Sequence, residues 1–216
     1  MPYRRTENVV RRLAEREEAI LAAATSIAAE GGMAAVQIAA VAARAGIAAG
    51  TVYRYFPCKT DLLAELTAVV AGRELAAITA AGNAAPGPLS ALAACIATFA
   101  MRALKERRLF WALIGEAINA EADVARLDFR RALSAALEAR IRTAIAAGHV
   151  PDQDASIAAP AVVGVLTESL LGPLAPPRPD AAVAHAAVQS ATLLALRALG
   201  VVDARARGLV VQYAPP

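Results

Sequence analysis

The sequence is poor in aromatic residues, which make up 4% of its 216 residues, and it contains only two cysteines. Cys58 and Cys95 lie far apart and have no partners at the spacing of metal ligands, which indicates free thiols in a reducing compartment. Strand-like alternation of apolar and polar residues is missing over any useful length. We therefore expect no disulfide framework, no metal, no cofactor and no β-sheet.

The sequence also lacks a stretch suited to crossing a membrane. Its longest uncharged run, residues 75–101, is interrupted by Gly82, Asn83 and the Pro-Gly-Pro at 86–88, whereas a spanning helix needs about 20 consecutive apolar residues. Four arginines lie within the first twelve residues, and no apolar segment follows them. This part of the sequence therefore does not resemble a secretory signal. These absences predict a cytoplasmic protein that does not contact a membrane.

Alanine, by contrast, fills 59 positions, which is typical of closely packed helices and predicts an all-α fold. The net charge of +3 is unevenly distributed along the chain. Residues 1–60 hold eight Lys and Arg against five Asp and Glu, and the remainder is balanced. An excess of positive charge in one small domain is typical of a surface that binds nucleic acid.

Helical periodicity and turn residues divide the chain into segments. We expect helices near residues 9–30, 37–44, 49–55, 58–82, 89–102, 106–119, 121–147, 154–171 and 180–199, followed by an irregular tail from 205 to 216. Cys58 and Asp61 stand at the spacing of a capping box. The two short helices must pack on the first one, because neither is long enough to be stable alone. This predicts an N-terminal three-helix domain, residues 1–57, connected by helix 58–82 to a larger helical domain, residues 58–216.

The most informative segment is residues 32–66, GMAAVQIAAVAARAGIAAGTVYRYFPCKTDLLAEL. Its first short helix has an apolar face of Ile38, Ala39, Val41 and Ala42, and Gly46 provides the turn before the second. With Val52 packed inward, the second helix would present these residues to solvent: Ala48, Ala49, Gly50, Thr51, Tyr53 and Arg54. Such a mixture of small, hydroxyl, phenol and guanidinium groups can enter a major groove and reach both bases and phosphates.

Residues 10–66 resemble the helix-turn-helix signature of the TetR family, through the Ala-Gly-Ile turn, Gly-Thr-Val-Tyr and Tyr-Phe-Pro-x-Lys. The resemblance implies that Gln37, Ala49, Gly50 and Tyr53 lie near bases and that Thr51, Tyr53, Tyr55 and Lys59 meet phosphates. Exposure of Arg54 adds that residue to the set. Ala35 and the Ala48-Ala49 pair depart from the family, where capping, polar or basic residues are common. More affinity would then come from an arm around Arg4 and Arg5.

The second domain shows no catalytic constellation, and its two histidines, His149 and His185, are isolated, so we expect no enzyme activity. Helices rich in small residues can leave a cavity between them, which would serve as a ligand-binding pocket. The residues expected to line it are Phe99, Phe110, Trp111, Glu116, Asn119 and Phe129.

Members of the TetR family pair their last two long helices into a four-helix bundle, so the resemblance also implies a homodimer. The residues expected at this dimer interface are Val162, Val165, Leu166, Ser169 and Leu170 of one helix and Ala187, Ser190, Ala191 and Leu194 of the other. A twofold dimer would set two recognition helices one or more DNA turns apart and would require a palindromic operator.

The leading hypothesis is a DNA-binding transcriptional repressor, released from its operator when an unidentified small hydrophobic effector moves helix 58–82. One alternative is an all-helical ligand-binding protein or enzyme whose helical hairpin is only structural. Another is a helix-turn-helix protein without an effector, which a closed and filled second domain would favour.

Overall fold

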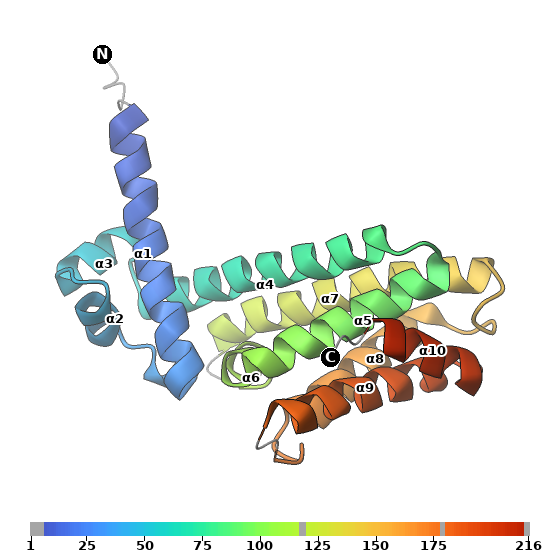
Figure 1. Ribbon diagram of the computed structural model, residues 1–216. Coiled ribbons are helices and arrows are strands. Elements are labelled where there is room, and N and C mark those ends of the chain that lie inside the picture. Colours follow the sequence, from blue (N-terminus) through green and yellow to red (C-terminus); the bar gives the residue numbers. More distant parts are fainter. Residues whose placement is uncertain (1–6, 117–119, 178–179, 214–216) are drawn as a thin grey trace.

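The computed structural model describes residues 7–116, 120–177 and 180–213, and in this part helices are joined by short turns with no strand among them (Figure 1). The all-α prediction is confirmed. The helices are α1 (Glu7–Gly31), η1 (Met33–Ala35, a 3-10 turn), α2 (Ile38–Arg44), α3 (Ala49–Tyr55), α4 (Lys59–Ala84), α5 (Pro88–Lys105), α6 (Arg107–Ile114), α7 (Ala120–Ala146), α8 (Ala155–Leu170), α9 (Ala181–Ala198) and α10 (Asp203–Tyr213).

Helices α2 and α3 lie on the side of α1 opposite the larger helical bundle (Figure 1). Gly46, between them, has a φ of 66°, which only glycine adopts without strain. Ile38 and Val41 of α2 are buried against α1, as the apolar pattern predicted. The same pattern was wrong for Ala39, which is exposed, because a seven-residue helix offers too few turns to define the limits of its buried face.

Helix α4 begins beside the N-terminal unit formed by α1, α2 and α3. It then runs along the bundle, where it packs against α5 and α7. It begins with the expected capping box, in which the Cys58 thiol accepts a hydrogen bond from the Asp61 amide and the Asp61 carboxylate accepts one from the Cys58 amide. The reciprocal pair satisfies two amides at the start of the helix, which fixes where α4 begins.

Helix α5 is the centre of the bundle and contacts α4, α7, α9 and α10. By length and composition it is the one helix in the described part of the chain that could cross a membrane, yet 61% of that window is buried inside the protein. Its apolar character is that of a core helix, covered by other helices on most sides.

Two expectations about the bundle were wrong. The helix expected over residues 106–119 ends at Ile114, after which the chain turns at Gly115. The tail expected to be irregular forms α10, whose Ala206, Leu209 and Val210 are buried against α5 and α9. Its first turn is also held by Asp203, which pairs with Arg197 and Arg207. The sequence did not reveal this helix, because the apolar positions of so short a segment can be recognised only when the helices that bury them are known.

Candidate nucleic-acid interface and domain junction

Helix α3 is anchored from beneath by two side chains. Val52 is completely buried and Phe56, just after the helix, is 4% exposed. Both belong to a core that includes Leu62, Leu63 and Leu66 of α4. Because one face of this short helix is fixed, its opposite face is held towards solvent.

The predicted DNA-contacting residues share this outer face and the turns beside it. Tyr53 is 51% exposed although it is a large aromatic residue. Gln37, Ala49, Gly50 and Arg54 are exposed, and Thr51, Tyr55 and Lys59 are half-buried. A Cβ atom added to Gly50 would meet no atom within 4 Å, so none of the described residues covers the start of α3. The arrangement leaves a surface on which a duplex can approach the backbone of α3 closely.

The charges on this surface are available to a ligand. Within the described residues, neither Arg54 nor Lys59 has an ion-pair partner, whereas Arg44 is bound by Glu30 of α1, with 2.8 Å between Arg44 Nη2 and Glu30 Oε2. Arg44 therefore fixes the angle between α1 and α2. Lys59 opens α4, where the helix dipole adds to its attraction for an anion. Arg4 and Arg5, predicted to form a DNA-binding arm, lie outside the described residues.

Comparison with known proteins agrees with this geometry. Residues 20–66 match the family model described as bacterial regulatory proteins, tetR family. The HTH-type transcriptional repressor KstR of Rhodococcus jostii is 47% identical over 73 residues, 34% of this chain and 32% of KstR. Its Mycobacterium tuberculosis counterpart is 50% identical over 66 residues, 31% of this chain and 28% of that protein. The chain thus matches about a third of the length of these curated relatives.

Solved structures extend the likeness to the whole fold. RolR, crystallised with resorcinol, gives a TM-score of 0.68 at 20% identity and covers 96% of this chain and 98% of its own. FadR of Bacillus subtilis, in complex with stearoyl-CoA, gives 0.72 at 21% identity, covering 84% and 98%. Residues 20–66 are therefore similar to the DNA-binding segment of the TetR family. The solved structures extend the likeness of the remaining chain to the fold.

Helices α1, α2 and α3, which we call the DNA-binding unit because residues 20–66 match the family model, have a core that is completed by a helix from far along the sequence. Leu109, Ala112 and Leu113 of α6 are each 1% exposed and lie in the same core cluster as Ile20 and Ile27 of α1. Helix α6 thus packs directly on α1. The division at residue 57 remains a prediction about the chain, but the apolar core continues across it, from α1 to α6.

Polar contacts close the same junction. The Arg108 guanidinium donates a hydrogen bond to the Gly31 carbonyl, with 3.0 Å between Nη2 and O, and it ion-pairs with Glu116. Glu116 in turn accepts a hydrogen bond of 3.0 Å from the Met33 amide. We call this set, Arg108, Glu116 and the backbone of residues 31–33, the junction latch. Sequence reasoning missed it, because Arg108 and Glu116 lie far along the chain from the turn that they hold.

The six residues expected to line an effector pocket are in different surroundings. Phe99 and Phe110 pack edge to face with ring centroids 5.8 Å apart, and each is 1% exposed. Phe129 is also buried, Trp111 is half-buried against the same core, and Glu116 belongs to the latch. Asn119 lies outside the described residues. Phe99 and Phe110 thus fill the bundle core, whereas Phe129 also borders an open groove beside α4. Helical periodicity alone could not distinguish core packing from a cavity lining.

The residues expected at the dimer interface also divide into two groups. Val162, Leu166, Leu170 and Ala191 are buried against their own chain, so little of their surface is open to a partner, and their place at a dimer interface stays a prediction. Val165, Ser169 and Ala187 are half-buried, and Ser190 and Leu194 are exposed. Both α8 and α9 have two apolar faces, and the sequence does not say which one the chain itself covers.

A buried carboxylate joins the first helices of the bundle. Glu74 of α4 is 1% exposed and receives hydrogen bonds from Arg102 of α5, 2.9 Å, and from Arg73, 2.8 Å. Arg73 also pairs with Glu106 at 3.0 Å. Burial acts to raise the pKa of Glu74, but the hydrogen bonds from Arg102 and Arg73 outweigh it and hold the pKa below 4.5. Glu74 therefore stays ionised and ties α4 to α5.

Replacing Glu74 by glutamine should lower the free energy of unfolding at pH 7 by about 2 kcal/mol, because hydrogen bonds to a buried charge are lost. Since the folded-state pKa is depressed, this stabilisation is present above the ordinary value of 4.5 and is lost as the pH falls through the folded-state value. The wild-type and Glu74→Gln curves from urea unfolding should converge in acid. Asp128→Asn, which breaks an exposed pair with Arg131, is the control and should change little. A pH-independent deficit for Glu74→Gln would contradict the prediction.

Proposed function

We propose that this chain is a transcriptional repressor that binds double-stranded DNA as a homodimer in the cytoplasm, with α3 in the major groove. The observation that carries the proposal is the outer face of α3, where Tyr53 and Arg54 are exposed and Arg54 has no ion-pair partner among the described residues. Residues 20–66, which include α3, match the tetR family model, and KstR repressors are among the similar proteins. Gln37, Ala49, Gly50 and Tyr53 would meet bases, and Thr51, Tyr53, Tyr55 and Lys59 would meet phosphates.

We further propose that the operator is palindromic and that a small hydrophobic effector releases the repressor from it. RolR and FadR, which share the fold, hold resorcinol and stearoyl-CoA in their structures. Helix α4 would act as the lever, because its first residues belong to the core of the DNA-binding unit and its remainder packs along α5 and α7. The filled core around Phe99 and Phe110 favours a second candidate, a repressor without an effector.

Selection of bound fragments from random DNA, followed by an electrophoretic shift at physiological salt, tests the proposal. We expect a palindromic consensus whose half-sites are separated by whole turns of DNA. Failure to retain any duplex would favour the alternative in which the helical hairpin is only structural. Retention without a palindrome would contradict the twofold arrangement but not DNA binding itself.

The dimer would form on the exposed parts of α8 and α9. An apolar groove lies there, and Leu194, 51% exposed, borders it. The other predicted interface residues that border this groove are Ser169, Leu170, Ala187, Ser190 and Ala191. A second copy that inserts its own α9 would cover this surface, as symmetric helix packing requires.

Leu194→Glu should weaken the dimer, because a charge would be buried at the interface without a partner. We expect the dimer dissociation constant to rise on the order of tenfold, measured by sedimentation velocity over a dilution series. Val211→Glu is the matched control, since Val211 is 76% exposed on α10 outside the predicted interface. Equal behaviour of the two variants would place the dimer contact elsewhere.

A further inference from the structure

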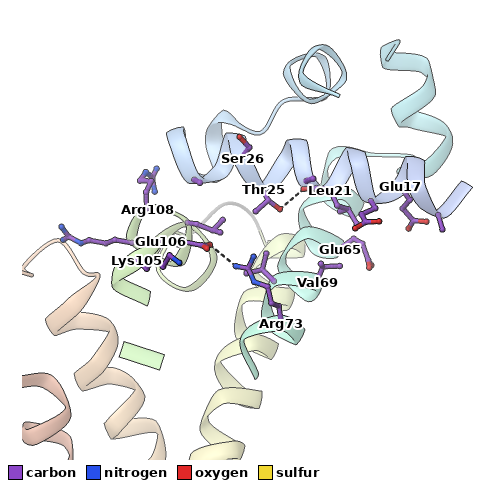
Figure 2. Close-up of a pocket in the computed structure, with 17 residues that line it drawn as sticks. Glu17, Leu21, Thr25, Ser26, Glu65, Val69, Arg73, Lys105, Glu106 and Arg108 are labelled. Atoms are coloured by element: carbon purple, nitrogen blue, oxygen red, sulfur yellow. Dashed lines mark hydrogen bonds and ion pairs between the residues drawn. The ribbon is translucent and has the colours of Figure 1, made fainter. Parts of the chain in front are cut away.

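An open groove of about 980 Å³ lies at the junction between the DNA-binding unit and the bundle (Figure 2). One wall is α1, from Ala14 to Ala29, and the other is formed by α4 and the corner between α5 and α6. This volume is within the range of small-molecule sites, which is about 300–1,000 Å³. The groove is separate from the bundle core in which an effector pocket was expected.

The groove has an apolar floor. Val70 and Leu109 are buried beneath it, Leu21 is half-buried, and Val69 is 48% exposed. Alanines of α1 continue the same surface, so a flat hydrocarbon or ring system could lie between the helices. Removing Val69 and Leu21 from water would then contribute to binding in proportion to the apolar area covered.

Charged residues lie at both ends of the groove, and Figure 2 shows Glu106, paired with Arg73, on the same side as Lys105. Glu17 and Glu65 lie at one end, and Lys105 and Arg108 lie at the other. Arg108 is already held by Glu116, and Arg73 by Glu74 and Glu106. Within the described residues Lys105 has no ion-pair partner, and it is exposed at the end of α5. Lys105 is therefore available to an anionic group, which Glu17 and Glu65 at the far end would repel. Arg107 also borders the groove without an ion pair among the described residues, but it donates a hydrogen bond to the Gly172 carbonyl.

We infer that the groove binds an amphipathic organic anion, with its apolar body over Leu21 and Val69 and its anionic group at Lys105. The inference rests on the proposed repressor function, for which this would be the effector site. A ligand here would touch α1, α4 and α6 together and would lie beside Arg108 of the junction latch. The bound ligand would stabilise the distance between α1 and the two helices α4 and α6 at which it fits best. A change in this distance would also shift α3, which packs in the same unit as α1.

Fluorescence titration of the full-length protein with 1-anilinonaphthalene-8-sulfonate tests the inference, with N-phenyl-1-naphthylamine as the neutral probe of the same shape. Val69→Trp fills the groove and should weaken sulfonate binding by about tenfold or more, since the apolar body loses its place. Lys105→Gln should weaken it about threefold to fivefold and leave the neutral probe unchanged. Val211→Trp, on α10 away from the groove, is the control and should retain binding.

The outcomes separate the site from the proposed function. Sulfonate binding that resists Val69→Trp, or that falls equally in Val211→Trp, would overturn the groove assignment. Equal affinity for both probes, unaffected by Lys105→Gln, would overturn the preference for an anion. An electrophoretic shift without probe tests DNA binding independently, so its failure would reject the repressor function even if the groove binds. Release of DNA by the sulfonate probe in the wild type, but not in Val69→Trp, would support both.

Discussion

Tyr53→Ala should reduce operator affinity on the order of a hundredfold, because a twofold dimer presents the residue twice and each lost contact costs about 1–2 kcal/mol. Tyr53 is 51% exposed on α3 and makes no contact that stabilises the core. The change should therefore act on binding and not on folding. Affinity is best measured by fluorescence anisotropy on the selected operator, at one fixed salt concentration.

Two further measurements make this result interpretable. The thermal unfolding curve of Tyr53→Ala should coincide with that of the wild type. Arg131→Ala removes an exposed guanidinium from α7, away from the proposed interface, and should leave DNA affinity unchanged. Unchanged affinity in Tyr53→Ala, or an equal loss in Arg131→Ala, would show that α3 does not read the duplex.

Gly32→Ala should cause a large loss of stability for a single methyl group. Gly32 has a φ of 78° and a ψ of −177°, a region that costs a residue with a Cβ atom about 1–3 kcal/mol. The new Cβ would also lie 1.7 Å from Nη2 of Arg108 and 2.7 Å from Oε2 of Glu116, so the latch must open. We expect the free energy of unfolding to fall by about 3 kcal/mol and the melting temperature by roughly 10 °C.

Gly148→Ala is the matched control for this prediction. Gly148 also has a positive φ, 69°, but a Cβ there would have open space around it. It should therefore lose only the backbone contribution, about 1 kcal/mol. Equal losses in calorimetric scans of the two variants would mean that the junction latch adds nothing to stability.

The junction gives these predictions a common basis. Helix α6 contributes Leu109 and Leu113 to the core under the DNA-binding unit, and the latch fixes the turn between α1 and η1. Since Arg108 also lines the groove, a bound ligand and the position of the DNA-binding helices would influence each other. Reciprocity of this kind is what effector control of DNA binding requires.

Local signals were sufficient for the helix-turn-helix. Gly46 fixed the turn, Pro57 and the Cys58–Asp61 capping box fixed the start of α4, and the bounds predicted for α3 match the structure. Each of these signals acts within a few residues, so the sequence contains both partners of the interaction. The outward position of Tyr53 and Arg54 follows in the same way, because Val52 and Phe56 orient so short a helix.

The sequence by itself therefore determined the all-α class, the order of the helices, the helix-turn-helix and the solvent-facing surface of α3. Only the tertiary structure decided that Phe99 and Phe110 fill the core, that Val162 and Leu166 face their own bundle, and that α10 is a helix. It also decided that Glu116 reaches back to Met33. Periodicity defines the face that residues share, whereas the neighbour that covers this face is set by packing between segments far apart in the chain.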